Sequence, residues 1–308
     1  KESIMSGWVT QGPKVRKFEE NFAKKHKVNH ALAVTSCTTG LHLALAAMGV
    51  GPGDEVIVPA FTWVATANVV LYCGATPVFV DVSTKTFNMD PEQVASKVTD
   101  KTKVIIPVHL FGLCADMDAI KAVIPKRVKI LEDAACAAGA KYKGKYAGTL
   151  GDAAVFSFHP RKSITTGEGG MITTQNDLFS ELMDQMRSHG ATISEEQRHH
   201  GPKPYILPDF NLLGFNYRMT DLQGSIGIVQ LEKLDSFIDE RSKWATWYRE
   251  KLSDIDWLKL PQEPENGKHG WQSFVTYVDP KTAPMSRNNI MEKLQNIGIS
   301  TRPGTHAV

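Results

Sequence analysis

Several classes of protein are excluded by what this 308-residue sequence lacks. No apolar run approaches the about 18 residues that a membrane-spanning helix needs, and no signal peptide opens the chain. The sequence has 35 basic and 33 acidic residues, so its net charge of +2 gives no electrostatic reason to expect nucleic acid. It also shows no internal repeat and no low-complexity tract. We therefore expect a globular protein without nucleic-acid or membrane partners.

Cysteine is also scarce, with 4 residues and no Cys-x-x-Cys pair. Their wide spacing indicates neither a disulfide framework nor a zinc knuckle, and no metal site is predicted. The expected location is the reducing cytoplasm. The chain begins without an initiator methionine and ends at Val308 within a segment that reads as extended, so both ends are expected to be incomplete.

From residue 30 onward, short β-branched runs alternate with helical stretches. This alternation predicts a largely parallel sheet that is covered by helices. The runs that read as strands are 31–36, 54–61, 76–82, 103–110 and 128–134. Asp90, Pro91 and Glu92 predict the start of one of the intervening helices, because they supply an N-cap, a first-position proline and an acidic first turn.

The alternation breaks in the middle of the chain. The apolar runs 152–158 and 169–174 are too close for a helical crossover, so this hairpin is predicted to be antiparallel. Further on, residues 219–253 read as one long helical run that leads to a second domain. We predict a large domain over residues 1–235, with an N-terminal arm, and a small, incomplete C-terminal domain over residues 236–308. A strand and a helix are expected in the latter, at 272–278 and 286–298.

Lys162 lies in the hairpin turn, directly before "SITTGEGG". A lysine on a turn is usually solvated. Here the glycines allow the backbone to approach a ligand closely, and the flanking strands are expected to be buried. An amine in such a place can have its pKa lowered and attack a carbonyl to form a Schiff base. This is the chemistry of a pyridoxal phosphate enzyme.

Such an enzyme needs three further groups, and each has a candidate. A carboxylate must pair with the pyridine nitrogen, and Asp133 follows a strand at the edge where open α/β sheets bind ligands. Asp133 could equally cap the next segment. Ser36, Thr38 and Thr39 stand between a strand and a helix, where they could bind the phosphate or form an ordinary N-cap. Trp63 could stack on the ring, although a lone tryptophan more often packs in a core.

A resemblance joins these residues. The run "SFHPRKSITTGEGG", with "EDAA" before it and "FNYRMTDLQGSIGIVQL" after it, resembles the DegT/DnrJ/EryC1/StrS family of sugar aminotransferases. The likeness extends over nearly the whole chain. It implies an α/β protein with the aspartate-aminotransferase-like fold, pyridoxal phosphate fold type I. That fold has a large domain with a mostly parallel mixed sheet and a small α+β C-terminal domain.

The resemblance implies pyridoxal 5'-phosphate as cofactor, with a pyridoxamine 5'-phosphate form during turnover. Lys162 would join its aldehyde, Asp133 would pair with its pyridine nitrogen, and Trp63 would stack on its ring. His159 could transfer a proton or contact the substrate, or it could simply pack.

The phosphate, in the same resemblance, would be held by Ser157 together with Thr38 and Thr39. Asn216 would reach the phosphate of the neighbouring subunit. This contact implies a homodimer with shared active sites.

Three departures from the family pattern affect these roles. Cys37 replaces the glycine of a Ser-Gly-Thr phosphate loop, so the backbone path is expected to differ slightly. Cys136 stands where the family has glutamine or histidine near the ring hydroxyl, and a thiol is a poorer hydrogen-bonding group. The family's last segment, which lines the sugar site, is largely missing, and His306 is a candidate to belong to it.

Three other polar residues have open roles. His199 and His200 are expected at the surface or on a lid over the substrate, since no carboxylate or cysteine accompanies them in a metal-binding pattern. Glu168 could orient the lysine turn or face the substrate.

The resemblance implies that the enzyme moves an amino group from glutamate to a keto sugar, with a nucleotide-linked 4-keto-6-deoxyhexose as the leading acceptor. The pathway would be cell-surface polysaccharide, lipopolysaccharide or deoxysugar biosynthesis. A 3-keto sugar or an 8-keto octulosonate remains an alternative acceptor, because loops rather than cofactor motifs select it. A non-catalytic regulator on the same fold is a further alternative. Lys162 argues against a sister branch of dehydratases, which has histidine at this position.

Overall fold

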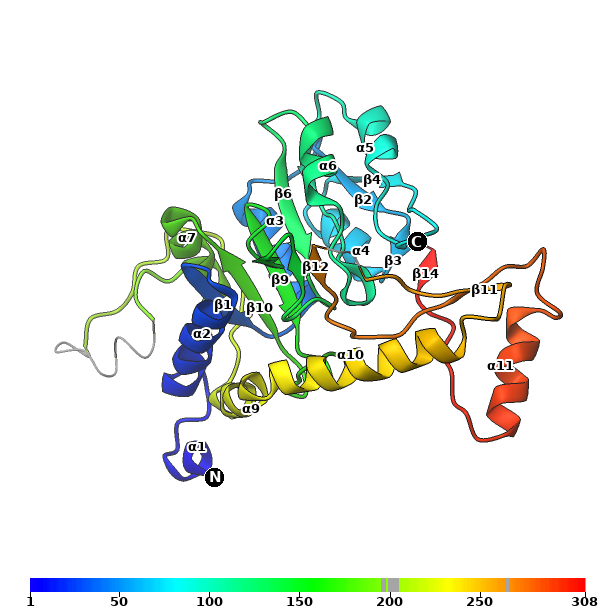
Figure 1. Ribbon diagram of the computed structural model, residues 1–308. Coiled ribbons are helices and arrows are strands. Elements are labelled where there is room, and N and C mark those ends of the chain that lie inside the picture. Colours follow the sequence, from blue (N-terminus) through cyan, green and yellow to red (C-terminus); the bar gives the residue numbers. More distant parts are fainter. Residues whose placement is uncertain (195–197, 199–204, 264–265, 308) are drawn as a thin grey trace.

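The computed structural model describes residues 1–194, 198, 205–263 and 266–307 (Figure 1). The helices are α1 (Glu2–Met5), α2 (Pro13–His26), α3 (Cys37–Ala47), α4 (Ala65–Tyr72), α5 (Pro91–Lys97), α6 (Met117–Val123), α7 (Asp177–Arg187), α9 (Asp221–Glu232), α10 (Leu234–Lys251) and α11 (Arg287–Asn296), with a 3₁₀ turn η1 (Leu110–Gly112).

The longer strands are β1 (His30–Val34), β2 (Glu55–Pro59), β4 (Thr76–Val80), β5 (Thr102–Ile105), β6 (Lys129–Asp133), β9 (Ala153–Ser157) and β10 (Gly170–Thr174). Two-residue strands are β3 (Phe61–Thr62), β7 (Lys141–Tyr142), β8 (Lys145–Tyr146), β11 (Leu258–Lys259), β12 (Gly267–Lys268), β13 (Tyr277–Val278) and β14 (His306–Ala307).

The seven longer strands form one sheet in the order β1-β10-β9-β6-β5-β2-β4. The pairs from β9 to β4 are parallel, whereas β10 is antiparallel to both of its neighbours. The predicted mixed, mostly parallel sheet and its antiparallel hairpin are therefore confirmed. The reversed strand β10 is internal, because it lies between β1 and β9.

Helices cover both faces of this sheet (Figure 1). Successive strand residues point to opposite faces, so Val56 and Val58 pack in the cluster that contains α3 and α4, while Ile57 packs with α5 and α6. Strands that are buried on both faces are typical of parallel sheets. This explains why the strands read as continuous apolar runs in the sequence.

A third cluster packs α2 and α9 against β9 and β10. Its centre is a group of buried phenylalanines, Phe18, Phe22, Phe156 and Phe158. Helix α9 approaches this group closely at Gly227, where a Cβ would lie 2.6 Å from the Phe18 ring. Any side chain at this position would therefore force the two helices apart.

Some local predictions differ from the structure. Helix α2 was not predicted, although its lysines and glutamates surround an apolar stripe. The long helical run divides into α9 and α10 at Lys233, which is the C-cap of one helix and the N-cap of the next. The strand expected at 272–278 is reduced to β13, paired with β11 alone. The domain boundary proposed after residue 235 stays a prediction; it lies in the first turn of α10, which runs along the edge of the molecule below the sheet (Figure 1).

His26 is the last residue of α2 and lies against the phenylalanines of the third cluster. Its Nδ1 donates to the carbonyl of Phe22 at 3.2 Å, and its Nε2 accepts from the amide of Gly139 at 3.2 Å. The imidazole is fully buried and stacks on the Phe22 ring at 4.0 Å. Burial, which disfavours the charged form, lowers the pKa of His26 to about 4.

This buried imidazole should make stability depend on pH. The unfolded chain binds a proton below pH 6.5 and the folded chain does so only near pH 4, so stability present above pH 6.5 is lost as the pH falls. The loss should reach about 3 kcal/mol. His26→Phe should remove this part of the dependence in urea unfolding measured between pH 7 and pH 4. Equal slopes for the wild type and the variant would contradict the prediction.

Candidate functional site

Asp133 ends β6 and lies at the carboxyl edge of the sheet with only 5% of its surface exposed. Its Oδ2 accepts from the Thr66 hydroxyl at 2.8 Å, and its Oδ1 accepts from the amide of Ala135 at 3.2 Å. Burial raises the pKa of this carboxyl, and the two hydrogen bonds oppose the rise. The carboxylate is thus held rigidly in a place with little water, where a cationic partner would be strongly favoured.

Lys162 reaches the same edge from the turn that follows β9. Because β9 is parallel to β6, with Asp133 paired to Val155, both residues stand at the ends of neighbouring strands. The Lys162 amine lies 3.2 Å from the Cys136 thiol, three residues beyond Asp133. The structure therefore brings together the two residues on which the predicted chemistry depends.

The expectation of a lowered lysine pKa is wrong for the groups of this chain. Burial lowers the pKa of Lys162, but the Cys136 thiol, followed by Cys37 and Asp133, raises it by more. The net effect is a pKa above the ordinary value. The protein's own side chains therefore favour the charged amine.

The lysine turn is closed by backbone contacts. The amide of Lys162 donates to the carbonyl of His159 at 2.9 Å, and His159 Nδ1 accepts from the amide of Arg161 at 3.2 Å. Gln272, from the C-terminal part of the chain, donates to the Arg161 carbonyl at 2.8 Å. The Glu168 carboxylate is exposed and lies 3.9 Å from His159 Nε2, at the outer side of the turn. His159 thus shapes the turn, and its role in proton transfer stays a prediction.

The predicted phosphate residues meet at the start of α3. Ser36 is the N-cap, and its hydroxyl accepts from the amide of Thr39 while the Thr39 hydroxyl accepts from the amide of Ser36. Gly170 packs on this helix start, since a Cβ there would lie 2.6 Å from the Ser36 carbonyl carbon, and it pairs with Ser157. The N-cap reading of this stretch is confirmed, and Gly170 links the helix start to Ser157; phosphate binding by these residues stays a prediction.

Cys37 is the first residue of α3 and has an ordinary helical position. Its thiol is buried, 3.7 Å from the carbonyl of Val155 and 4.0 Å from Asp133 Oδ1. Burial raises the pKa of Cys37 well above its usual range, so it is a neutral thiol. The helix start is regular, and no glycine conformation is needed at this position.

Trp63 precedes α4, three residues before Thr66, and 62% of its surface is exposed. It is therefore not a core residue. Asn216 is also exposed, and the next residue, Tyr217, accepts a backbone hydrogen bond from Thr35 at 3.0 Å. These positions are compatible with ring stacking and phosphate contact, which stay predictions.

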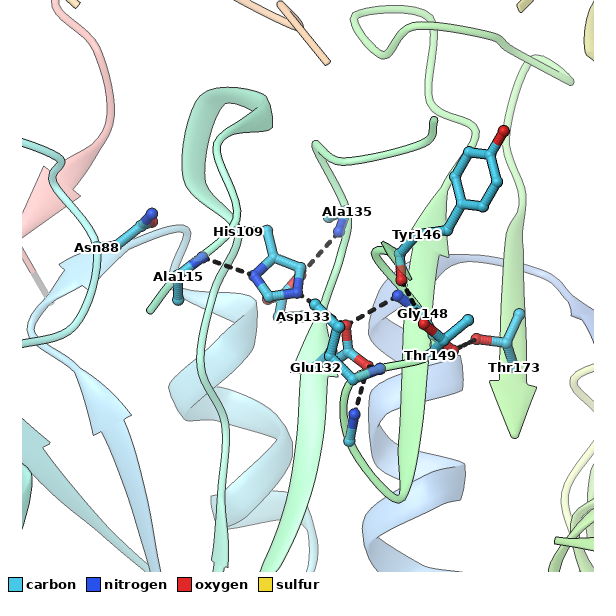
Figure 2. A network of polar contacts seen from close by, with 12 residues as sticks. Asn88, His109, Ala115, Glu132, Asp133, Ala135, Tyr146, Gly148, Thr149 and Thr173 are labelled. Carbon is cyan, nitrogen blue, oxygen red and sulfur yellow. Dashed lines mark hydrogen bonds and ion pairs between the residues drawn. The ribbon is translucent and has the colours of Figure 1, made fainter. Parts of the chain in front are cut away.

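On the other face of β6, Glu132 is fully buried in a network of polar contacts (Figure 2). It accepts from His109 Nε2 at 2.8 Å and from the amides of Gly148, Leu150 and Gly151 at 2.7 to 2.8 Å. His109 Nδ1 accepts from the amide of Ala115, so its Nε2 must carry the proton. The backbone amide of His109 donates to the carbonyl of Asp133, which joins this network to the site.

Sequence reasoning missed Thr66, Glu132, His109 and Gln272. The signal for Glu132 was an acidic residue directly after the apolar pair Ile130 and Leu131 in a strand expected to be buried, since a buried carboxylate needs several donors. Thr66 and Gln272 gave no signal, because their partners lie 67 and 111 residues away along the chain.

Two expectations concern other regions. His199 and His200 lie outside the described residues. His306 belongs to β14, which pairs with β3 and places its backbone opposite Thr62, beside Trp63. Within the part of the chain that the structure describes, no group of three or more His, Cys, Asp or Glu residues could hold a metal ion, and no helix is both long and apolar enough to span a bilayer.

Comparisons with known proteins agree with this geometry. The profile of the DegT/DnrJ/EryC1/StrS aminotransferase family matches residues 1–305. The chain belongs to this family. It is 41% identical to GDP-perosamine synthase of Caulobacter vibrioides, over 99% of this chain and 80% of that protein. It is 39% identical to the spore coat polysaccharide biosynthesis protein SpsC of Bacillus subtilis, over 97% of this chain and 78% of that protein.

The solved structures include Spr1654 of Streptococcus pneumoniae in its PMP-form, with a TM-score of 0.92 and 30% identity over 99% of this chain and 82% of that one. The same protein has been solved in a PLP-form, with a TM-score of 0.86 and 31% identity over 97% of this chain and 79% of that one. The predicted fold type I, the cofactor pyridoxal phosphate and the class of pyridoxal phosphate-dependent sugar aminotransferase are therefore confirmed.

The residues present also fit this cofactor. A buried carboxylate, an amine on a neighbouring turn, a helix N-terminus with adjacent hydroxyls and an exposed aromatic ring lie at one edge of the sheet. They match the pyridine nitrogen, the aldehyde, the phosphate and the ring face of pyridoxal phosphate.

Removing the charge of Glu132 should destabilise the fold. Glu132→Gln would place an NH₂ group among four donors, leaving at least one buried group without a partner. We expect a loss of about 3 kcal/mol in urea unfolding. Glu181→Gln, on the exposed face of α7, is the matched control and should change stability by less than about 0.5 kcal/mol. A loss equal to that of the control would refute the role of the network.

Proposed function

We propose that this enzyme transfers an amino group from glutamate to a nucleotide-linked 4-keto-6-deoxyhexose, in cell-surface polysaccharide or deoxysugar biosynthesis in the cytoplasm. The observation that carries the chemistry is the placement of Lys162 and Asp133 at the ends of the parallel neighbours β9 and β6. A regulator without catalysis would have no need for either group.

Lys162 holds the cofactor and then moves a proton. Its Nζ would hold the cofactor through the aldehyde, by a condensation that releases water. With an amino donor in its place, the same Nζ would be free to take up the proton of the donor's α carbon and to return a proton on the cofactor side. Pyridoxal phosphate, when bound, supplies a ring that stabilises negative charge on that carbon. The position of the Lys162 amine, 3.2 Å from the thiol of Cys136, which stands three residues beyond Asp133, supports this role.

Asp133 keeps the pyridine nitrogen protonated. Its carboxylate is oriented by Thr66 and by the amide of Ala135, so it can offer a charge-assisted hydrogen bond without reorganisation. Burial strengthens this interaction, because the local dielectric constant is low.

The phosphate would be held by Ser157, Thr38, Thr39 and the first amides of α3, where Ser36 and Thr39 form a capping box. A helix N-terminus is suited to a dianion because its amides are unpaired and its dipole is positive there. Trp63 covers the exposed ring face, and its large exposed surface supports this role.

The acceptor is proposed from the relatives. One of them is named for the synthesis of a GDP-linked amino sugar, and the other for spore coat polysaccharide. The identity of 41% with the former extends over 99% of this chain. An acceptor of the same chemical class, a keto sugar joined to a nucleotide, is therefore the first to test.

The acceptor can be tested directly. The enzyme in its pyridoxamine form should transfer its amine to nucleotide-linked 4-keto-6-deoxyhexoses, and the amino sugar is measured by mass spectrometry. Lys162→Ala should reduce the rate by at least about a hundredfold, since it removes the proton carrier. Lys121→Ala, an exposed lysine on α6, should keep the wild-type rate.

Two results would contradict parts of this proposal. Amination of only a 3-keto sugar or of the free eight-carbon keto acid would refute the acceptor. Borohydride reduction that labels a lysine other than Lys162 would refute the assignment of the link.

The working unit is proposed to be a homodimer with shared sites. Asn216 is exposed at the edge where segment 216–218 runs beside β1, so its amide is available to a neighbouring subunit. A neutral amide can donate to a phosphate without changing the charge balance. The apolar residues exposed nearby, Phe210, Leu212 and Leu213, are consistent with a covered surface.

Mixed dimers can test the shared site. Lys162→Ala and Asn216→Ala should each be nearly inactive alone. Heterodimers of the two should regain part of the activity, because one site carries both changes and the other carries neither. Coexpression with two affinity tags isolates these heterodimers. A heterodimer as inactive as its parents, or a fully active monomer, would exclude the shared site.

A further inference from the structure

Cys136 is the residue near the site that the proposed chemistry leaves without a task. It stands three residues after Asp133, at the end of "EDAAC". Of the four cysteines, Cys136 is the one whose thiol lies within hydrogen-bond distance of the Lys162 amine, at 3.2 Å. Cys37, the other cysteine near the site, directs its thiol to Val155 and Asp133 instead.

The backbone on both sides of this contact is fixed. Cys136 lies inside a turn in which the amide of Ala137 donates to the carbonyl of Ala134 at 2.9 Å, and the amide of Ala134 donates to β9 at Val155. Lys162 ends a second turn that is closed by its own amide. Two anchored turns thus bring a short thiol against the end of a long, flexible side chain.

We propose that Cys136 is a positioning residue that holds the amine of Lys162 at the carboxyl edge of β6. This inference rests on the proposed role of Lys162 and extends it to the residue that stands where the family has glutamine or histidine.

The chemistry of the pair suits this task. A thiol sulfur can accept a hydrogen bond from an ammonium group, and its S–H can donate to a neutral amine, so the contact is available in both protonation states of Lys162. The contact with the charged form is stronger, because it is charge-assisted. The lysine side chain is a flexible four-carbon stem, so its amine keeps one position only where a partner group holds it.

The other titratable groups near the amine are the Asp133 carboxylate and the neutral thiol of Cys37. Burial lowers the pKa of Lys162, whereas the contact with Cys136 and, less strongly, the charge of Asp133 raise it. Removal of the Cys136 thiol should therefore lower the pKa of the Lys162 nitrogen.

The test is a pH titration of the holoenzyme, followed by the visible absorption of its lysine–cofactor link. Cys136→Ala should shift the midpoint to lower pH by roughly one unit, the effect of one hydrogen bond to a charged group. Cys136→Ser retains a donor and an acceptor and should titrate close to the wild type. Cys73→Ala, at the end of α4, is the matched control and should leave the midpoint unchanged.

A second measurement avoids any folding defect of the alanine variant. Wild-type enzyme treated with methyl methanethiosulfonate carries a methyl disulfide at Cys136, formed with release of methanesulfinate. A disulfide sulfur cannot donate a hydrogen bond and accepts one less well than a thiol, so the titration midpoint should again shift to lower pH. The Cys136→Ser variant, treated in the same way, can be modified only at the other cysteines. Its titration midpoint should not change on treatment.

A wild-type midpoint in both Cys136→Ala and the treated enzyme would overturn the positioning role. So would equal shifts for Cys136→Ala and Cys136→Ser, which would indicate packing rather than hydrogen bonding. A wild-type holoenzyme without a reducible link at Lys162 would refute the proposed function itself, and the positioning role with it.

Discussion

The burial of two consecutive carboxylates at the end of β6 is the constraint on which the site depends. Neighbouring strand residues point to opposite faces, so Glu132 and Asp133 enter different environments. A buried carboxylate is costly unless donors surround it. Glu132 has four donors and is saturated, which ties β6 to the segment 148–151 and to His109. Asp133 has two close donors and keeps capacity for a cation on the cofactor.

The reversed strand β10 assembles the remaining parts around this carboxylate. Because β9 is parallel to β6 and β10 returns beside it, the loop that carries Lys162 must start at the same edge as Asp133. Because β10 also pairs with β1, the start of α3 comes to the same edge, where Gly170 allows close contact with Ser36. One antiparallel strand therefore brings the lysine, the carboxylate and the start of α3 to one edge of the sheet.

Much of this arrangement could be predicted from local patterns. The apolar runs indicated the strands, and the glycines after Lys162 indicated an unusual turn. Contacts distant in sequence could not be predicted, because neither Thr66 nor Gln272 differs locally from an ordinary helix or loop residue. The shift of the Lys162 pKa was predicted in the wrong direction, because it too depends on a contact between residues distant in sequence. Burial, which lowers this pKa, was expected, but the contact with the Cys136 thiol, which raises it, was not. The break between α9 and α10 at Lys233 could not be predicted either, because the pattern of apolar residues in the sequence shows no clear interruption there.

The hydrogen bond from Gln272 to the Arg161 carbonyl has a consequence for the order in which the enzyme matures. During synthesis, the lysine turn leaves the ribosome 111 residues before the side chain that clamps it. Domains fold from the N-terminus as the chain grows, so the sheet and its carboxylate can form while this turn still lacks its clamp. The lysine turn is therefore completed only once the chain has grown past Gln272 and this segment has folded back onto the turn.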